Sequence, residues 1–206
     1  MSVLPPSFTE DLADLPTTAF GHRSLTWWGV IAFMVIEGVF FAMLFAAYFF
    51  LMSHEADWPP EPRIPPDLLA GTLFTLVMLL SEIPNSWIKK AAEKQDTHKV
   101  RKLIWIPVAI GVILFVLRGF EFNSLNAKWY DNAYASVIWA LLFLHTAHVA
   151  TDWVDTVVLA FLVQTEQGFA PRKLVDAEEN CLYWRFVWLT WLPVYVLIYW
   201  LPRWVA

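Results

Sequence analysis

Residues 25–52 read LTWWGVIAFMVIEGVFFAMLFAAYFFLM, an almost unbroken apolar stretch. Roughly 20 apolar residues are enough for a helix to cross a bilayer, so this stretch predicts a transmembrane helix. Its single charged residue, Glu37, lies near the middle. Because a charge at the bilayer centre costs at least ~2.5 kcal/mol, we expect Glu37 to face other protein or water rather than lipid.

The rest of the chain repeats this pattern. Of its 206 residues 58% are hydrophobic and only 16% are charged, a composition typical of a polytopic membrane protein. We therefore expect an all-α bundle of five transmembrane helices over residues 25–204, preceded by a short acidic arm over residues 1–24. The further apolar stretches predict helices over residues 67–88, 100–120, 133–163 and 182–201.

Positive charges in the loops predict the orientation of the bundle. The connection between the second and third apolar stretches holds six cations, whereas the first connection holds one and the third holds two. Loops rich in Lys and Arg tend to stay on the cytoplasmic side. The amino terminus and a predicted loop over residues 164–180 are then inside, and the carboxyl terminus is outside. The six cations are Lys89, Lys90, Lys94, Lys99, Arg101 and Lys102.

The chain has few residues that could hold a redox cofactor. Its one cysteine, Cys181, cannot form an internal disulfide or a Cys-x-x-Cys site. Of its five histidines only His145 and His148 lie in a predicted span. This set is too small for two haems and a copper or for a di-iron centre, so we expect no catalytic residue, metal or cofactor in this chain.

Polar residues nevertheless share one face of the fourth predicted helix. His145, His148, Asp152 and Asp155 are spaced by 3, 4 and 3 residues, which places them along a single helical stripe. We expect the stripe to face protein and to form hydrogen bonds between helices. The alternative is a metal site in which both histidines join a carboxylate from Glu37 or Asp152.

Two other charged positions have local interpretations. Glu37 is either a structural hydrogen-bonding group or a protonatable, carbodiimide-reactive carboxyl that borders an internal cavity. Arg118 and Glu121, three residues apart near the end of the third span, predict a local ion pair at the membrane interface.

The start of the fifth span suggests contacts with the membrane surface. Arg185 can extend toward a lipid phosphate, or it can pair with Asp152 or Asp155. Trp184 lies beside it, at a span end where indole rings favour the headgroup layer. Both residues, with Arg118, are therefore candidates for a lipid contact or a subunit interface.

Several stretches resemble subunit III of the haem-copper oxidases in its five-helix bacterial form. Glu37 falls on the membrane-embedded acidic position of that family, and the His145/His148 pair with the aromatic fifth span is the most specific part. The chain departs from the family pattern at Asp152, where a Gly is usual, and at Arg185 and Trp188, where His and Asp are usual. We expect Asp152 and Arg185 to form a relocated ion pair. The matching stretches are FGHRS, FMVIEGVFFAMLFAAYFFL, TLFTLVMLLSEIPNSWIKKAAEKQD, RGFEF, LHTAHVATDWVDTVVL and YWRFVWLTWLPVYVLIYWLP.

The resemblance implies an accessory subunit without a redox centre, in a multi-pass protein of the bacterial inner membrane. Its partners would be subunit I, which carries haem and copper, subunit II, small subunits and bound phospholipid, with no nucleic acid. The complex would reduce oxygen to water and pump protons, and this chain would support proton uptake and stability. Alternatives are the accessory subunit of a nitric-oxide-reductase system or a small transporter.

The inside-facing acids extend this expectation. They could form a proton-collecting surface near an uptake channel, or simply a solvated acidic loop. These residues are Glu10, Asp11, Asp14, Asp176, Glu178 and Glu179.

Overall fold

The computed structural model describes residues 25–61, 64–165 and 171–205, all of whose regular elements are helices. The predicted acidic arm, residues 1–24, lies outside the described residues. Within them, five helical stretches are long and apolar enough to cross a membrane, which confirms the predicted all-α, five-span fold class. The elements are α1 (Leu25–His54), α2 (Leu68–Glu93), α3 (Thr97–Leu103), α4 (Trp105–Asn123), α5 (Ala133–Gln164), α6 (Pro171–Tyr195), the π-helical turn η3 (Val196–Trp200) and α7 (Leu201–Val205).

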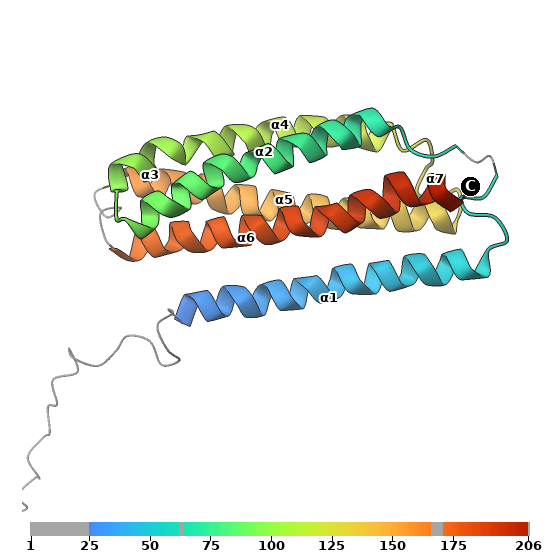
Figure 1. Ribbon diagram of the computed structural model, residues 1–206, viewed down its shortest axis with the longest axis horizontal. Helices are drawn as coiled ribbons and strands as arrows, with labels where there is room; N and C mark the ends of the chain where they lie inside the picture. Colours follow the sequence, from blue (N-terminus) through green and yellow to red (C-terminus); the bar gives the residue numbers. More distant parts are fainter. Residues whose placement is uncertain (1–24, 62–63, 166–170, 206) are drawn as a thin grey trace, which may run out of the picture.

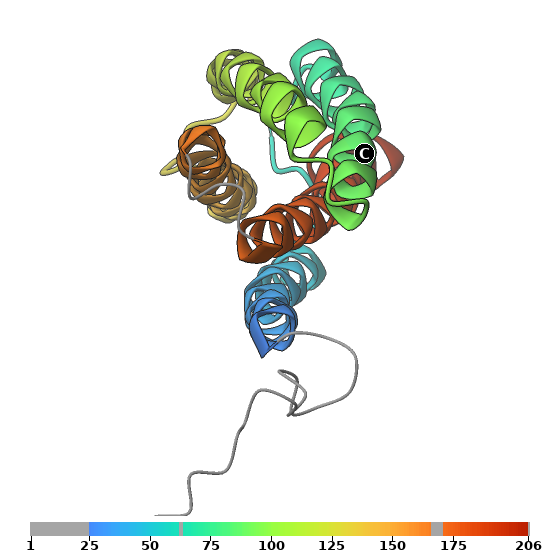
Figure 2. The ribbon, with the colours of Figure 1, turned by 90° about the vertical axis from the view of Figure 1, so that its left-hand side faces the viewer.

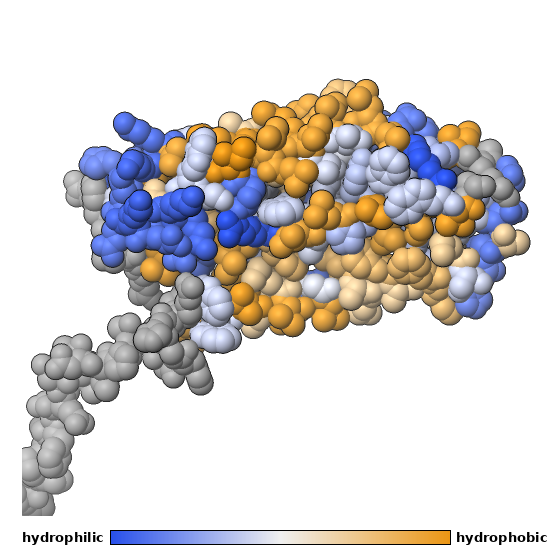
Figure 3. Space-filling view, in the orientation of Figure 1, coloured by the Kyte–Doolittle hydropathy of each residue, from blue (hydrophilic) through white to orange (hydrophobic). Residues whose placement is uncertain are grey.

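The helices run side by side along one axis, and α1 lies at the edge of the bundle against α5 and α6 (Figures 1 and 2). Only Phe41 and Tyr48 of α1 are buried, whereas α5 buries residues along its whole length. An apolar belt separates polar ends in the space-filling view, as expected for a bilayer-spanning bundle (Figure 3). The outer face of α1 is therefore available to lipid or to another subunit.

The two ends of the bundle differ in charge. Helix α2 ends, and α3 follows, at the same end of the bundle as that at which α1 begins. We call it the lysine-rich end, because it carries Lys89, Lys90, Lys94, Lys99 and Lys102.

The third span is two helices in line. Asp96 caps α3, since the Lys99 amide donates to its Oδ1 at 3.1 Å. The Lys99 ammonium lies 2.7 Å from Asp96 Oδ2. The hydrogen bonds that the Lys99 ammonium and the Lys99 amide donate to the Asp96 carboxylate lower the pKa of that carboxyl. In α4, Gly111 permits close approach of α5, because an added Cβ would overlap the Trp153 indole. That indole also donates to the Val108 carbonyl at 2.9 Å.

The last span begins earlier than the sequence suggested. Helix α6 starts at Pro171, so the predicted loop over residues 164–180 is wrong from that point on. The physical reason is a second hydrophobic cluster at the lysine-rich end. Leu174, Ala177 and Cys181, spaced as one helical face, are buried there against Ile88 and Val163.

The other end of this span contains a widened turn. Pro193 interrupts the α-helical hydrogen bonds of α6, and the π-helical turn η3 follows within three residues. Three side chains spaced by four residues then reach neighbouring elements. Tyr195 Oη lies 2.8 Å from Thr72 Oγ1, Tyr199 donates to Glu121, and Arg203 donates to the Pro66 carbonyl.

Candidate functional site

A buried ion pair occupies the half of the bundle farther from the lysine-rich end. Arg118 Nη1 donates to Glu121 Oε2 at 2.7 Å, and the two side chains are 3% and 0% exposed. Tyr199 donates to Glu121 Oε1 at 2.7 Å. The Arg118 guanidinium also lies 3.8 Å from the Phe74 ring centroid and 4.5 Å from that of Trp191. The predicted ion pair therefore exists and is buried inside the bundle. Its location near the membrane interface stays a prediction.

His145 is held by this pair. Arg118 Nη2 donates to its Nδ1 at 2.8 Å, and its Nε2 lies 3.0 Å from the Val187 carbonyl. Arginine only donates and a carbonyl only accepts, so the ring must be the neutral form with its proton on Nε2. Both nitrogens are thus occupied by protein. Among the described residues no three His, Cys, Asp or Glu side chains are grouped to hold a metal.

We call Arg118, Glu121, His145 and Tyr199 the upper network. Its hydrogen bonds join α4, α5, α6 and η3, and Arg118 Nε is its one buried nitrogen without a partner among the described residues. This arrangement matches the structural alternative for His145 rather than the metal-ligating one.

A second polar group surrounds Glu37, nearer the lysine-rich end. Tyr183 donates to Glu37 Oε2 at 2.6 Å, and His148 Nε2 lies 3.4 Å from Glu37 Oε1. His148 Nδ1 is 2.7 Å from the Leu144 carbonyl and therefore carries a proton. His148 Nε2 and Glu37 Oε1 lie within ion-pair distance but are not aligned for a hydrogen bond. We call these two residues the Glu37–His148 pair.

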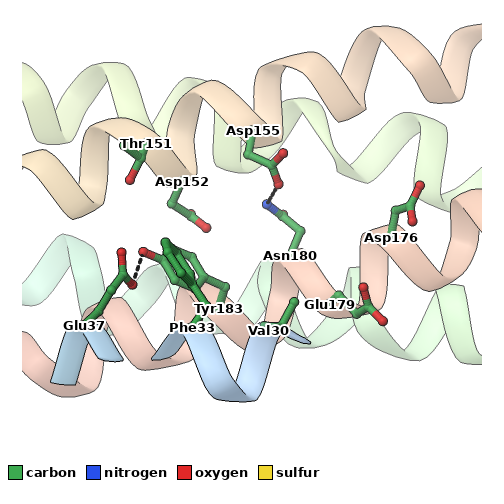
Figure 4. Close-up of a pocket in the computed structure, with 10 residues that line it drawn as sticks. All are labelled: Val30, Phe33, Glu37, Thr151, Asp152, Asp155, Asp176, Glu179, Asn180 and Tyr183. Atoms are coloured by element: carbon green, nitrogen blue, oxygen red, sulfur yellow. Dashed lines mark hydrogen bonds between the residues drawn. The ribbon is translucent and has the colours of Figure 1, made fainter. Parts of the chain in front are cut away.

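A cavity of about 400 Å³ opens beside this pair, between α1, α5 and α6 (Figure 4). Five of its ten lining residues are carboxylic acids, and none is Lys, Arg or His. Asp176 and Glu179, from the first turns of α6, lie toward the lysine-rich end, whereas Glu37 lies at the other end of the cavity. The lining residues are Val30, Phe33, Glu37, Thr151, Asp152, Asp155, Asp176, Glu179, Asn180 and Tyr183.

Asp152 lines this cavity but does not meet Arg185. It is 3% exposed, and its Oδ1 has no hydrogen-bond partner. Arg185 instead pairs with Glu82 of α2, with Nε and Nη2 at 2.6 and 2.5 Å from Glu82 Oε1. The relocated ion pair is therefore wrong, because Asp152 borders the cavity between α1, α5 and α6 whereas Arg185 faces α2. In the structure the Arg185 guanidinium binds the Glu82 carboxylate in place of the expected lipid phosphate.

Trp184 also lies elsewhere than expected. Its indole donates to Ser81 Oγ at 2.8 Å, and the residue is 8% exposed. A position inside the bundle, against α2, is not that of an interfacial anchor, so this expectation is wrong.

Two polar residues of the cavity were absent from the sequence-based candidates. Tyr183 holds Glu37, and Asn180 donates to Asp155 Oδ2 at 3.1 Å. Their positions, three residues apart on α6 and continuing the face of Asp176 and Glu179, were the available signal.

Comparison with known proteins gives a consistent result. The profile of the family described as cytochrome c oxidase subunit III matches residues 17–203. A cytochrome c oxidase subunit 3 from Thermostichus vulcanus is 25% identical over 185 residues, covering 90% of this chain and 92% of that protein. One from a Synechocystis strain is 29% identical, covering 87% and 77%. A probable cytochrome c oxidase subunit 3 from Nocardia farcinica is 30% identical, covering 83% and 85%.

Proposed function

Because the chain belongs to the cytochrome c oxidase subunit III family, we propose that it binds the catalytic subunit I of a membrane oxidase and supports its proton uptake. It is an accessory subunit and a multi-pass membrane protein. The family membership favours an oxidase over a nitric-oxide-reductase system or a transporter.

The haem and copper of the proposed complex belong to subunit I, and subunit II and small subunits complete it. The lysine-rich end faces the inside of a bacterial inner membrane, because clustered Lys and Arg favour that side. Phospholipid covers the outer face of α1, where Val35, Ile36, Val39 and Met43 are all more than half exposed. In a bilayer such residues need apolar neighbours.

The observation that carries the proton-uptake proposal is the acidic cavity. Carboxylates and histidines in series inside a membrane are the usual groups of proton relays. Here Asp176 and Glu179 stand at the lysine-rich end, and the Glu37–His148 pair stands at the inner limit of the same cavity. A cleft lined by one sign of charge also raises the local concentration of counter-ions, in this case protons. The acidic cavity therefore suits collection of protons from the inner side.

The first experiment tests the assembly. Tagged protein is purified in mild detergent and analysed by visible spectroscopy and by mass spectrometry of its partners and lipids. Reduced haem bands together with a large polytopic partner are the expected result. A colourless single chain would contradict the proposal.

The second experiment tests proton uptake in the purified complex. Glu37→Gln removes the carboxyl at the inner end of the cavity while keeping the side-chain shape. We expect slower proton uptake at alkaline pH, where protons are scarce and collection limits the rate. The matched control is Glu93→Gln, an exposed carboxyl at the same end of the bundle, 3.8 Å from Lys89. Equal rates for both variants and the unmodified complex would refute the role of the cavity.

A further inference from the structure

Two buried polar atoms beside the acidic cavity have no hydrogen-bond partner in the described chain. They are Asp152 Oδ1 and His148 Nε2, on residues that are 3% and 7% exposed. At 3.4 Å, His148 Nε2 is within ion-pair distance of Glu37 but is not aligned for a hydrogen bond. A buried polar atom without a partner costs about 1–3 kcal/mol. Asp152 lines the acidic cavity, so its unpartnered Oδ1 favours an occupant that forms hydrogen bonds.

The lining identifies the chemistry of that occupant. Its five acids supply oxygen acceptors when ionised, so the occupant must donate hydrogen bonds. An anionic headgroup would be repelled by them. At ~30 Å³ per molecule, about 400 Å³ has room for roughly a dozen waters. Water and hydronium both donate and fit the available space.

The cavity ends abruptly toward the upper network. One turn beyond Glu37 on α1, Phe41 is 2% exposed, and its ring centroid lies 4.9 Å from that of His148 and 6.4 Å from that of His145. From α6, the fully buried Val187 lies at the same level, since its carbonyl binds His145. Phe41 thus separates the Glu37–His148 pair from the upper network, and the two polar groups on α5 do not meet.

From these contacts we infer that the cavity is a blind-ended proton well, filled with water, in which Asp152 holds an exchangeable proton. Asp152 lies between the Asp155–Asn180 pair and the Glu37–Tyr183 pair (Figure 4). A hydronium that enters from the lysine-rich end transfers its proton to the Asp152 carboxylate and leaves as water. The reverse step returns the proton to the same side. This inference deepens the proposed function and depends on it for the identity of that side as the inside.

Titratable groups near Asp152 come from α1 (Glu37), α5 (His148 and Asp155) and α6 (Cys181 and Tyr183). Toward α2 and α4 Asp152 lines a second cavity of about 10 Å³, where its neighbours include the uncharged side chains Asn85, Ile88 and Pro107.

The first test is infrared spectroscopy of the oxidase complex transferred from H₂O to D₂O. We expect a carbonyl-stretch band of a protonated carboxyl that shifts in D₂O and is absent in Asp152→Asn. Asp152→Ala must lose the same band, and Glu93→Gln must keep it. Retention of the chain in the complex and an unchanged haem spectrum establish that each variant assembles. A band that survives both Asp152 substitutions overturns the inference, even if Glu37→Gln still slows proton uptake.

The second test addresses the blind end. Passive proton conductance is measured in vesicles that contain the inhibited complex. We expect no conductance above that of empty vesicles for the unmodified chain and a severalfold rise for Phe41→Ala, which joins the two polar groups. The matched control, Phe40→Ala, removes a neighbouring ring that is 53% exposed and should have no effect. Conductance in the unmodified complex, or equal conductance for both Phe variants, overturns the blind end.

Discussion

Substitution of Glu121 tests the energetics of the upper network most directly. In Glu121→Gln the Arg118 guanidinium, 3% exposed and 2.7 Å from the carboxylate, would lose its counter-charge within the bundle. Breaking a buried pair in this way costs about 3–5 kcal/mol. The loss of the charge-assisted bond from Tyr199 belongs to the same cost and should not be added separately.

A double variant separates charge from packing. Arg118→Leu with Glu121→Leu removes both charges, and such replacements are often neutral, so we expect most of the lost stability to return. The exposed pair Lys89–Glu93 is the control, and Glu93→Gln should cost under about 1 kcal/mol.

Thermal unfolding of the purified complex, followed by tryptophan fluorescence, ranks these variants, since the chain has thirteen Trp. The expected order of stability is Glu93→Gln, then the double variant, then Glu121→Gln. If the double variant were as unstable as Glu121→Gln, the uncompensated charge would not be the cause and the reasoning would fail.

Two further predictions concern packing and helix capping. Gly111→Ala should destabilise the α4–α5 contact by about 1–3 kcal/mol, because its Cβ would overlap Trp153, whereas Gly119→Ala has open space and should be tolerated; thermal unfolding compares the two. Because the pKa of Asp96 is lowered in the folded chain, the stabilisation of α3 is present above the unfolded pKa and is lost as pH falls through the folded pKa. The protection of the Lys99 amide, measured as its hydrogen-exchange rate relative to that of an unfolded chain at the same pH, should fall over that window. Asp96→Asn, which keeps the cap but not the charge, should remove this change in protection.

The sequence was sufficient for the fold class and for most of the inward-facing positions. The cost of charge in hydrocarbon requires Glu37 to avoid lipid, and helical periodicity places His145, His148, Asp152 and Asp155 on one side of a helix. Both arguments depend on one helix at a time. The structure places the first three residues of that stripe among its buried residues, whereas Asp155 is exposed.

Pairing between helices could not be obtained in the same way. Arg185 meets Glu82 because α2 and α6 pack closely with those two residues at the same level along the bundle axis. The relative axial position of two helices cannot be predicted from the sequence pattern of either helix alone. The burial of Arg118 could not be predicted for the same reason, because it depends on contacts at the end of α4 with Tyr199 and Trp191 of the last span. The early start of α6 was missed because its first turns are amphipathic rather than apolar.

The π-helical turn η3 has a consequence for chain length. A π-helical turn closes i→i+5 hydrogen bonds and so holds one residue more than an α-helical turn over about the same rotation. Removal of one residue between 196 and 200 would therefore restore a regular α-helix while leaving the residues after it on nearly the same side. Arg203 would then keep its position facing the Pro66 carbonyl. Alignments of the family should therefore allow a gap at η3, and the residue that follows it should be compared by its place around the helix rather than by its number.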